Sequence, residues 1–219
     1  MVLTVFYSQR AYTLPDSLSI DEVKRCHFFR FEKDKRRFTF AHRFKRDMLS
    51  EIYPDVLPVE WNFFTSENGK PYVKNPISFN LSHSHDAVAM AILKKQSNMN
   101  IGVDIECYQE VEDRDSLSRL IFHPEELSMF NSIVDKKKGF YLLWTAKEAL
   151  LKANGSGLVN NLSEVNCAQC LSGNPALVVW QNTRYWIDIK CLGWGVCSVA
   201  WNESLHISSL LFVNKLNVE

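Results

Sequence analysis

The sequence has no excess of charge of either sign. Its 25 lysines and arginines are balanced by 25 aspartates and glutamates, so the formal net charge of the 219 residues is zero. A balanced chain offers no broad positive field to nucleic acid or to an anionic membrane surface, and neither is expected as a partner. Any polyanion that binds must therefore meet a local cluster of basic residues.

Targeting and membrane-spanning patterns are also missing. Residues 1–10 lack the basic start, the apolar run and the small-residue cleavage site of a signal peptide. The uncharged run at residues 87–93 is far too short to cross a bilayer. With 46% hydrophobic and 12% aromatic residues, the chain has the composition of an ordered globular protein. We expect a cytoplasmic protein with a substantial core.

The six cysteines form no compact framework. Cys167 and Cys170 have the spacing of a metal-binding pair, but no second pair of this kind accompanies them. Cys191 and Cys197 are two further thiolates that such a site would need. Scattered thiols are more often buried side chains than ligands, so we expect ordinary thiols rather than zinc or disulfides.

Two successive parts of the chain each run from helices to strands, without a residue-level repeat or a low-complexity linker. The first part is expected to hold a strand, a pair of helices capped by Ser19, and two further strands: residues 2–7, 19–48, 77–82 and 87–93. The second part is expected to hold three helices and four strands: residues 113–120, 124–131, 136–153, 176–180, 185–190, 195–201 and 206–213.

The most informative stretch is an acidic strand at residues 101–106. Apolar and acidic residues alternate there, so Asp104 and Glu106 point to one side and three aliphatic side chains to the other. Gly102 lets another group come close. Two carboxylates on one face suit a hard metal ion, although the solvated side of an edge strand has the same pattern.

A helix at residues 136–153 carries the second chemical signal. Trp144, Glu148 and Lys152 are spaced four apart and therefore share one stripe of the helix. An exposed ion pair between Glu148 and Lys152 is the ordinary interpretation of that spacing. Trp144 on the same stripe indicates instead that this face packs against another element, and Glu148 would complete a metal site with the acidic strand.

Five motifs occur in a fixed order: Gly-Lys-Pro at residues 69–71, Phe-Asn-Leu-Ser-His-Ser at 79–84, the acidic strand at 101–106, Phe-His-Pro-Glu-Glu at 122–126 and Trp-Thr-Ala-Lys-Glu-Ala-Leu-Leu-Lys at 144–152. This ordered set resembles the 4′-phosphopantetheinyl transferases, in particular the surfactin-synthetase-activating (Sfp-like) type. The resemblance covers about residues 69–157 most clearly.

The resemblance implies an α+β fold of two similar subdomains, residues 1–98 and 99–219, related by pseudo-twofold symmetry. Each would be a small three-stranded antiparallel sheet packed on a long helix, with the break near residues 95–100. The active site would lie in the cleft between them, and the protein would be a monomer.

The implied reaction moves the 4′-phosphopantetheine arm of coenzyme A onto a serine of an apo acyl, peptidyl or aryl carrier protein. The released product would be adenosine 3′,5′-bisphosphate. The implied metal is Mg²⁺, with Mn²⁺ as an alternative, held by Asp104, Glu106 and Glu148. Lys152 matches the lysine that contacts the pyrophosphate, and Lys147 is secondary because it lies about 100° around the helix from Glu148.

The resemblance also assigns contacts to coenzyme A. The matching residues are Arg37 for the 3′-phosphate, the turn at Gly69, Lys70 and Pro71, and the pair Ser82 and His83. Arg37 comes from a dense run of basic residues with interleaved phenylalanines over residues 24–46, in which Arg30 and Lys33 are weaker candidates. Most charges of that run are expected to be solvated.

Glu126 matches the carboxylate that acts as general base on the carrier serine, with the adjacent Glu125 as the alternative. Exposed basic and apolar residues between 122 and 138 are candidates for the carrier docking face. Two other functions use the same residues: a metal-dependent phosphohydrolase, in which water is the nucleophile, and a coenzyme-A-binding scaffold without transfer. Neither explains His83, Lys70 and Lys152 in their order as well as the transferase does.

Overall fold

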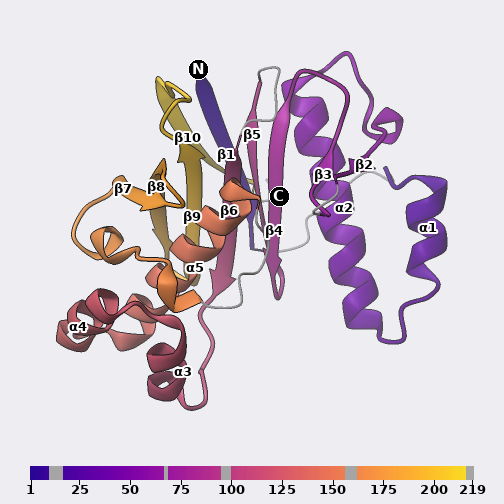
Figure 1. Ribbon diagram of the computed structural model, residues 1–219. Helices are drawn as coiled ribbons and strands as arrows, with labels where there is room; N and C mark the ends of the chain where they lie inside the picture. Colours follow the sequence, from indigo (N-terminus) through magenta and orange to yellow (C-terminus); the bar gives the residue numbers. More distant parts are fainter. Residues whose placement is uncertain (10–16, 67–68, 95–99, 156–161, 216–219) are drawn as a thin grey trace. The chain divides into compact units, whose positions relative to one another are not determined.

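The computed structural model describes residues 1–9, 17–66, 69–94, 100–155 and 162–215. The chain divides into two compact units, which we call unit 1 (residues 1–97 and 207–219) and unit 2 (residues 98–206). Each unit contains a four-stranded sheet and a long helix (Figure 1). The expected α+β class is confirmed, but both main sheets have four strands rather than three. The pseudo-twofold relation stays a prediction.

The sheet of unit 1 takes its strands from both ends of the chain. Its order is β10 (Ser209–Asn214), β1 (Val2–Ser8), β5 (Ala87–Leu93) and β4 (Ser78–Ser84). The three neighbouring strands β1, β5 and β4 are antiparallel, whereas β10 runs parallel to β1. Placing residues 99–219 in one subdomain is therefore wrong for the last strand, because its backbone hydrogen bonds are made with β1.

Strand β5 and helix α2 build the core of unit 1. All seven residues of β5 are buried, as its uncharged sequence predicts. Helix α2 (Glu32–Ile52) follows α1 (Ile20–Cys26) after a break at residues 27–31, so the expected pair of helices is observed. Its buried residues Ala41, Phe44 and Met48 are spaced three and four apart, and together with the adjacent Leu49 they form one apolar stripe. This stripe packs on the strands β4 and β5.

The start of α1 is fixed by a reciprocal cap. The amide of Glu22 donates to the Ser19 hydroxyl at 3.3 Å, and the amide of Ser19 donates to the Glu22 carboxylate at 2.9 Å. The expected role of Ser19 as N-cap is confirmed. The cap also brings Glu22 to the side of α1 that faces α2, where it meets three basic side chains.

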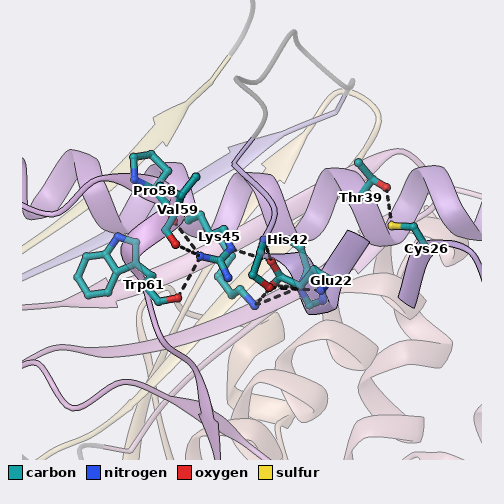
Figure 2. A network of polar contacts seen from close by, with 10 residues as sticks. Glu22, Cys26, Thr39, His42, Lys45, Pro58, Val59 and Trp61 are labelled. Atoms are coloured by element: carbon teal, nitrogen blue, oxygen red, sulfur yellow. Dashed lines mark hydrogen bonds and ion pairs between the residues drawn. The ribbon is translucent and has the colours of Figure 1, made fainter. Parts of the chain in front are cut away.

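These contacts form a buried polar network, which we call the Glu22 network (Figure 2). Arg46 donates to Glu22 at 2.8 Å, and His42 lies 2.6 Å from the other carboxylate oxygen. Lys45 approaches the same carboxylate to 3.6 Å. Burial opposes ionisation of Glu22, but hydrogen bonds from His42, the Ser19 amide and Arg46 outweigh it and hold its pKa well below the ordinary value.

Unit 2 contains a fully antiparallel sheet, on which one long helix packs. The strand order is β6 (Ile101–Cys107), β9 (Gly195–Asn202), β8 (Thr183–Leu192) and β7 (Ala176–Trp180). Helix α5 (Lys136–Asn154) packs on the sheet, and the shorter helices α3 (Arg114–Ile121) and α4 (Pro124–Ser132) precede it. Gly155 ends α5 with a left-handed φ of 81°. The helices and strands expected in residues 113–201 are all observed.

Smaller expectations have mixed outcomes. The short strand β2 (Phe64–Thr65) pairs with β3 (Pro71–Tyr72). The turn at residues 67–71 and the break near residues 95–100 lie partly outside the described residues. All six cysteines are free thiols, and Cys191 is the exposed one. No helix of the described ranges combines the length and apolarity needed to cross a bilayer.

Candidate functional site

The acidic strand β6 lies directly under helix α5. A Cβ atom placed on Gly102 would come within 2.1 Å of the Ala149 carbonyl oxygen and 2.4 Å of the Ala153 nitrogen. The missing side chain is therefore what allows the helix backbone to rest on the strand. Because side chains alternate along a strand, Asp104 and Glu106 share the face of Gly102 and point to the side of α5.

Asp104 is held against α5 by an ion pair. The Lys152 ammonium group lies 2.6 Å from a carboxylate oxygen of Asp104, and only 4% of Asp104 is exposed. Next to it, the hydroxyls of Thr145 on α5 and Ser198 on β9 lie 2.7 Å apart. Ser198 pairs with Asp104 across the β6–β9 ladder. The solvated edge-strand interpretation is wrong for Asp104, although β6 does lie at the edge of the sheet.

Glu148 is electrostatically coupled to Asp104. It lies one helical turn before Lys152 on α5 and is partly buried. Burial raises the pKa of the Glu148 carboxyl, the negative charge of Asp104 raises it further, and Lys152 opposes both. A carboxylate whose pKa is raised by a neighbouring carboxylate marks a place where a cation is favoured.

The donor set fits a hard divalent cation. Asp104, Glu106 and Glu148 offer carboxylate oxygens from one strand and the helix above it, and oxygen is the donor that Mg²⁺ prefers. Across the described ranges, no three acidic, histidine or cysteine side chains are already gathered as a complete ligand set. In this structure Lys152 supplies the positive charge that Asp104 requires, and a divalent ion would supply more.

Glu126 is buried, whereas a base that acts on a carrier serine must be accessible to it. It is 0% exposed, and one of its oxygens lies 2.7 Å from the Lys147 ammonium group. The amides of His123 and Cys167 donate to the two carboxylate oxygens at 2.7 and 2.6 Å. Burial raises the pKa of Glu126 and Lys147 opposes that rise. The role of general base stays a prediction, and these contacts favour a structural role.

The neighbouring Glu125 is exposed and accepts a hydrogen bond from the Asn166 side chain at 2.8 Å. Lys147, a secondary candidate for the site, is 1% exposed. One signal for its burial was available in the sequence. Lys147 lies four residues from both Leu143 and Leu151, so it occupies the apolar stripe of α5.

Apart from Lys152, the residues predicted to contact coenzyme A belong to unit 1. Gly69 has a φ of 79°, the left-handed conformation that suits glycine in a tight turn. Burial lowers the pKa of the adjacent Lys70 to about 8. Pro71 begins the short strand β3.

The other predicted contacts of unit 1 lie on β4 and α2. Ser82 and His83 are consecutive on β4, so they face opposite sides; Ser82 is buried and His83 is exposed. Arg37 on α2 is partly exposed and lies 3.9 Å from the Asp34 carboxylate. Asp104, Glu148 and Lys152 thus form one group in unit 2, and the other predicted coenzyme A contacts are distributed over unit 1.

Comparisons with known proteins identify the family of the chain. A sequence model described as the 4′-phosphopantetheinyl transferase superfamily matches residues 100–196, which include β6 and α5. The 4′-phosphopantetheinyl transferase HetI of Nostoc sp. is 35% identical over 162 residues, which are 71% of this chain and 66% of that protein.

Two further relatives carry the same description. The 4′-phosphopantetheinyl transferase psf-1 of Bacillus pumilus is 31% identical over 73% of this chain and 67% of its own length. The 4′-phosphopantetheinyl transferase gsp of Aneurinibacillus migulanus is 37% identical over 65% of this chain and 59% of its own length. The chain thus spans about two thirds of the length of the curated relatives it matches. It belongs to the 4′-phosphopantetheinyl transferase family.

Proposed function

We propose that this protein transfers the 4′-phosphopantetheine group of coenzyme A to a serine of an apo carrier protein, releasing adenosine 3′,5′-bisphosphate. The carrier is an acyl, peptidyl or aryl carrier domain, and the enzyme is of the Sfp-like type. One observation carries the proposal: within the superfamily match, α5 rests on Gly102 and brings Glu148 and Lys152 to Asp104. Membership of the family gives no support to a phosphohydrolase or a scaffold without transfer.

In this proposal Asp104, Glu106 and Glu148 hold Mg²⁺, with Mn²⁺ as an alternative. When bound, the ion neutralises charge on the pyrophosphate and so favours attack at phosphorus. The negative charge of Asp104 raises the pKa of Glu148, and this supports the assignment, because a bound cation stabilises both charged carboxylates.

Lys152 is the proposed cationic partner of the pyrophosphate. Its ammonium group reaches Asp104 at 2.6 Å, so it lies beside one of the carboxylates that would hold the metal. A positive charge fixed at this place stabilises negative charge that develops on the leaving phosphate. The serine oxygen forms a bond to the β-phosphorus, the bond from that phosphorus to the bridging oxygen breaks, and the serine proton passes to a base.

The proposed coenzyme A contacts are Arg37, Gly69, Lys70, Pro71, Ser82 and His83. Lys70 offers the best physical support, because burial lowers its pKa to about 8. A phosphate beside its ammonium group would favour the charged form and raise that pKa again. The exposed imidazole of His83 and the guanidinium group of Arg37 are donors of the kind that bind phosphate.

The activity is tested by direct transfer. The protein is incubated with Mg²⁺, coenzyme A and a panel of apo acyl, peptidyl and aryl carrier domains, and each carrier is weighed by mass spectrometry. We expect a mass gain equal to one phosphopantetheine arm on at least one carrier. If no carrier gains the arm while a known transferase modifies all of them, the proposed function is rejected.

The metal assignment makes a separate prediction. Asp104→Ala and Glu148→Ala should each lower the transfer rate by about a thousandfold or more, because each removes a carboxylate ligand and the charge neutralisation that depends on it. Circular dichroism should show that both variants stay folded. Glu203→Gln in the same unit, which changes a partly exposed carboxylate paired with Arg184 at 3.2 Å, is the control and should keep the wild-type rate. A wild-type rate in either alanine variant would refute the assignment.

A further inference from the structure

A second ion pair lies on the side of α5 that faces away from the sheet. Lys147 and Glu126 are both almost completely buried, and their charged groups are 2.7 Å apart. Lys147 is about 200° around the helix from Thr145 and from Ala149, the residues that contact β9 and β6. The pair therefore holds α5 from the opposite side.

Lys147 connects residues 162–165 to α5 through hydrogen bonds. Its ammonium group donates to the carbonyl oxygen of Leu162 at 2.9 Å and to that of Val165. With Glu126 as third partner, all three hydrogens of the ammonium group have acceptors.

Glu126 accepts hydrogen bonds both at the start of α4 and just before the short helix Ala168–Leu171. It occupies the third position of α4 and accepts the amide of His123, which completes a capping box. Its other oxygen accepts the amide of Cys167. Two side chains thus connect three parts of unit 2: α4, α5 and residues 162–167.

These contacts leave no place for a substrate hydroxyl. A general base must come within about 3 Å of the proton it removes, directly or through one water molecule. Glu126 is 0% exposed, and both oxygens already accept hydrogen bonds from groups of the protein. Removing it from this arrangement would leave the Lys147 ammonium group buried without its counter-charge, which is costly.

We propose that Glu126 and Lys147 are positioning residues, which fix the rotation of α5 and so hold Glu148 toward Asp104. In this role Glu126 does not take the proton of the carrier serine. The inference rests on the proposed transferase function for its catalytic part. Its structural part, the attachment of residues 162–167 and of α4 to α5, stands independently.

The decisive comparison is between Glu126→Gln and the double variant Glu126→Gln/Lys147→Met. If Glu126 positions the helix, much of the damage in the single variant comes from the unpaired Lys147 charge. We expect kcat to fall at least tenfold in Glu126→Gln and the double variant to recover at least threefold of this loss. If Glu126 were the base, removing Lys147 as well would restore nothing.

The pH–rate profile gives a second readout that folding alone does not change. We expect both variants to keep the inflections of the wild-type profile, with kcat lowered at every pH and KM for coenzyme A within about twofold. Loss of the limb that reports the catalytic base in Glu126→Gln alone would overturn the proposal, even if the double variant failed to fold. A double variant that melts like wild type but is no more active than Glu126→Gln would overturn it as well.

A partly exposed ion pair in the same unit is the matched control. Glu203→Gln and Glu203→Gln/Arg184→Met change a carboxylate and its cationic partner at 3.2 Å, and neither should alter kcat. Amide hydrogen exchange tests the structural attachment of α4 and residues 162–167 to α5 independently of the transferase function. In Glu126→Gln the amides of His123 and Cys167 should exchange at least tenfold faster. If exchange is faster in this variant but the wild-type protein modifies no carrier, the transferase function is rejected and the structural attachment of α4 and residues 162–167 to α5 is retained. Unchanged exchange would reject the attachment itself.

Discussion

At the scale of single residues, the site depends on Gly102, because this residue has no Cβ atom. Gly102 has backbone atoms of Ala149 and Ala153 within 2.4 Å of the place where a Cβ would stand. Backbone cannot rotate away as the end of a flexible side chain can. The distance between β6 and α5, and with it the approach of Lys152 to Asp104, is therefore set by this glycine.

Gly102→Ala should displace α5 from the strand. We expect a loss of about 1–3 kcal/mol in the free energy of unfolding, the usual cost of overpacking, together with a large fall in transfer rate. Gly173→Ala is the matched control, because no atom lies within 4 Å of its Cβ position, and it should change stability by less than about 0.5 kcal/mol. Urea denaturation of both variants measures the difference, and equal stabilities would show that α5 tolerates the methyl group.

The sequence predicted the residue types of the site better than their contacts. Alternation placed Asp104 and Glu106 on one face, and helical spacing placed Glu148 and Lys152 on one stripe, because both patterns are local. The ion pair of Lys152 with Asp104 joins residues 48 positions apart, and the pair of Lys147 with Glu126 depends on how α4 meets α5. Such contacts follow from packing, which periodicity does not specify.

At the scale of elements, the Glu22 network joins α1 to α2 and to the loop that follows. Arg46 donates to Glu22 and also to the carbonyl oxygens of Pro58 and Trp61, at 2.9 and 3.0 Å. Lys45 lies 3.7 Å from the centre of the Phe63 ring. Burial lowers the pKa of Lys45 to about 8, an effect that Glu22 opposes. One carboxylate thus compensates several buried positive groups.

Glu22→Gln should destabilise the protein by about 3 kcal/mol at pH 7, because it leaves buried basic groups without a counter-charge. The folded-state pKa of Glu22 lies below its unfolded value of about 4.3. Its contribution to stability is therefore present above about pH 5 and is lost as the pH falls through the folded-state pKa. The difference between variant and wild type should accordingly shrink at pH 3.5.

The control for this prediction is Asp21→Asn on the same helix. Asp21 is exposed and lies 3.5 Å from Lys24, so its replacement should cost about 1 kcal/mol or less. Urea denaturation at pH 7 and pH 3.5 measures both variants. A cost for Glu22→Gln that equals that of Asp21→Asn, or that stays constant between the two pH values, would contradict the network's role.

At the scale of the whole molecule, the sequence predicts the strands, but it does not predict the pairing of β10 with β1. The strand expected at residues 206–213 is observed as β10, yet sequence order assigned it to the second subdomain. It pairs instead with β1 over six residues, from Val2 with Ser209 to Tyr7 with Asn214. Alternation along a strand indicates which face is buried, but the choice between distant neighbours depends on the complete sheet.

Unit 1 should therefore depend on a segment more than a hundred residues away from the rest of it. Without β10, strand β1 becomes an edge with unpaired backbone groups, and the packing of Val213 on the core of unit 1 is lost. Truncation after His206 should speed amide exchange at least tenfold in β1 and β5. The strands β6, β8 and β9 of unit 2 should keep most of their protection, because their hydrogen bonds lie within residues 98–206.

Hydrogen exchange with mass spectrometry measures this pattern, and Leu211→Thr is its control. The Leu211 side chain is 47% exposed, and its replacement keeps the backbone pairing of β10 with β1, so exchange should be nearly unchanged. Equal acceleration in both units after truncation would mean that they unfold as one cooperative body. Unchanged exchange in β1 would mean that β10 adds nothing to the sheet. Acceleration confined to unit 1 is the result that follows from a sheet closed by the two ends of the described chain.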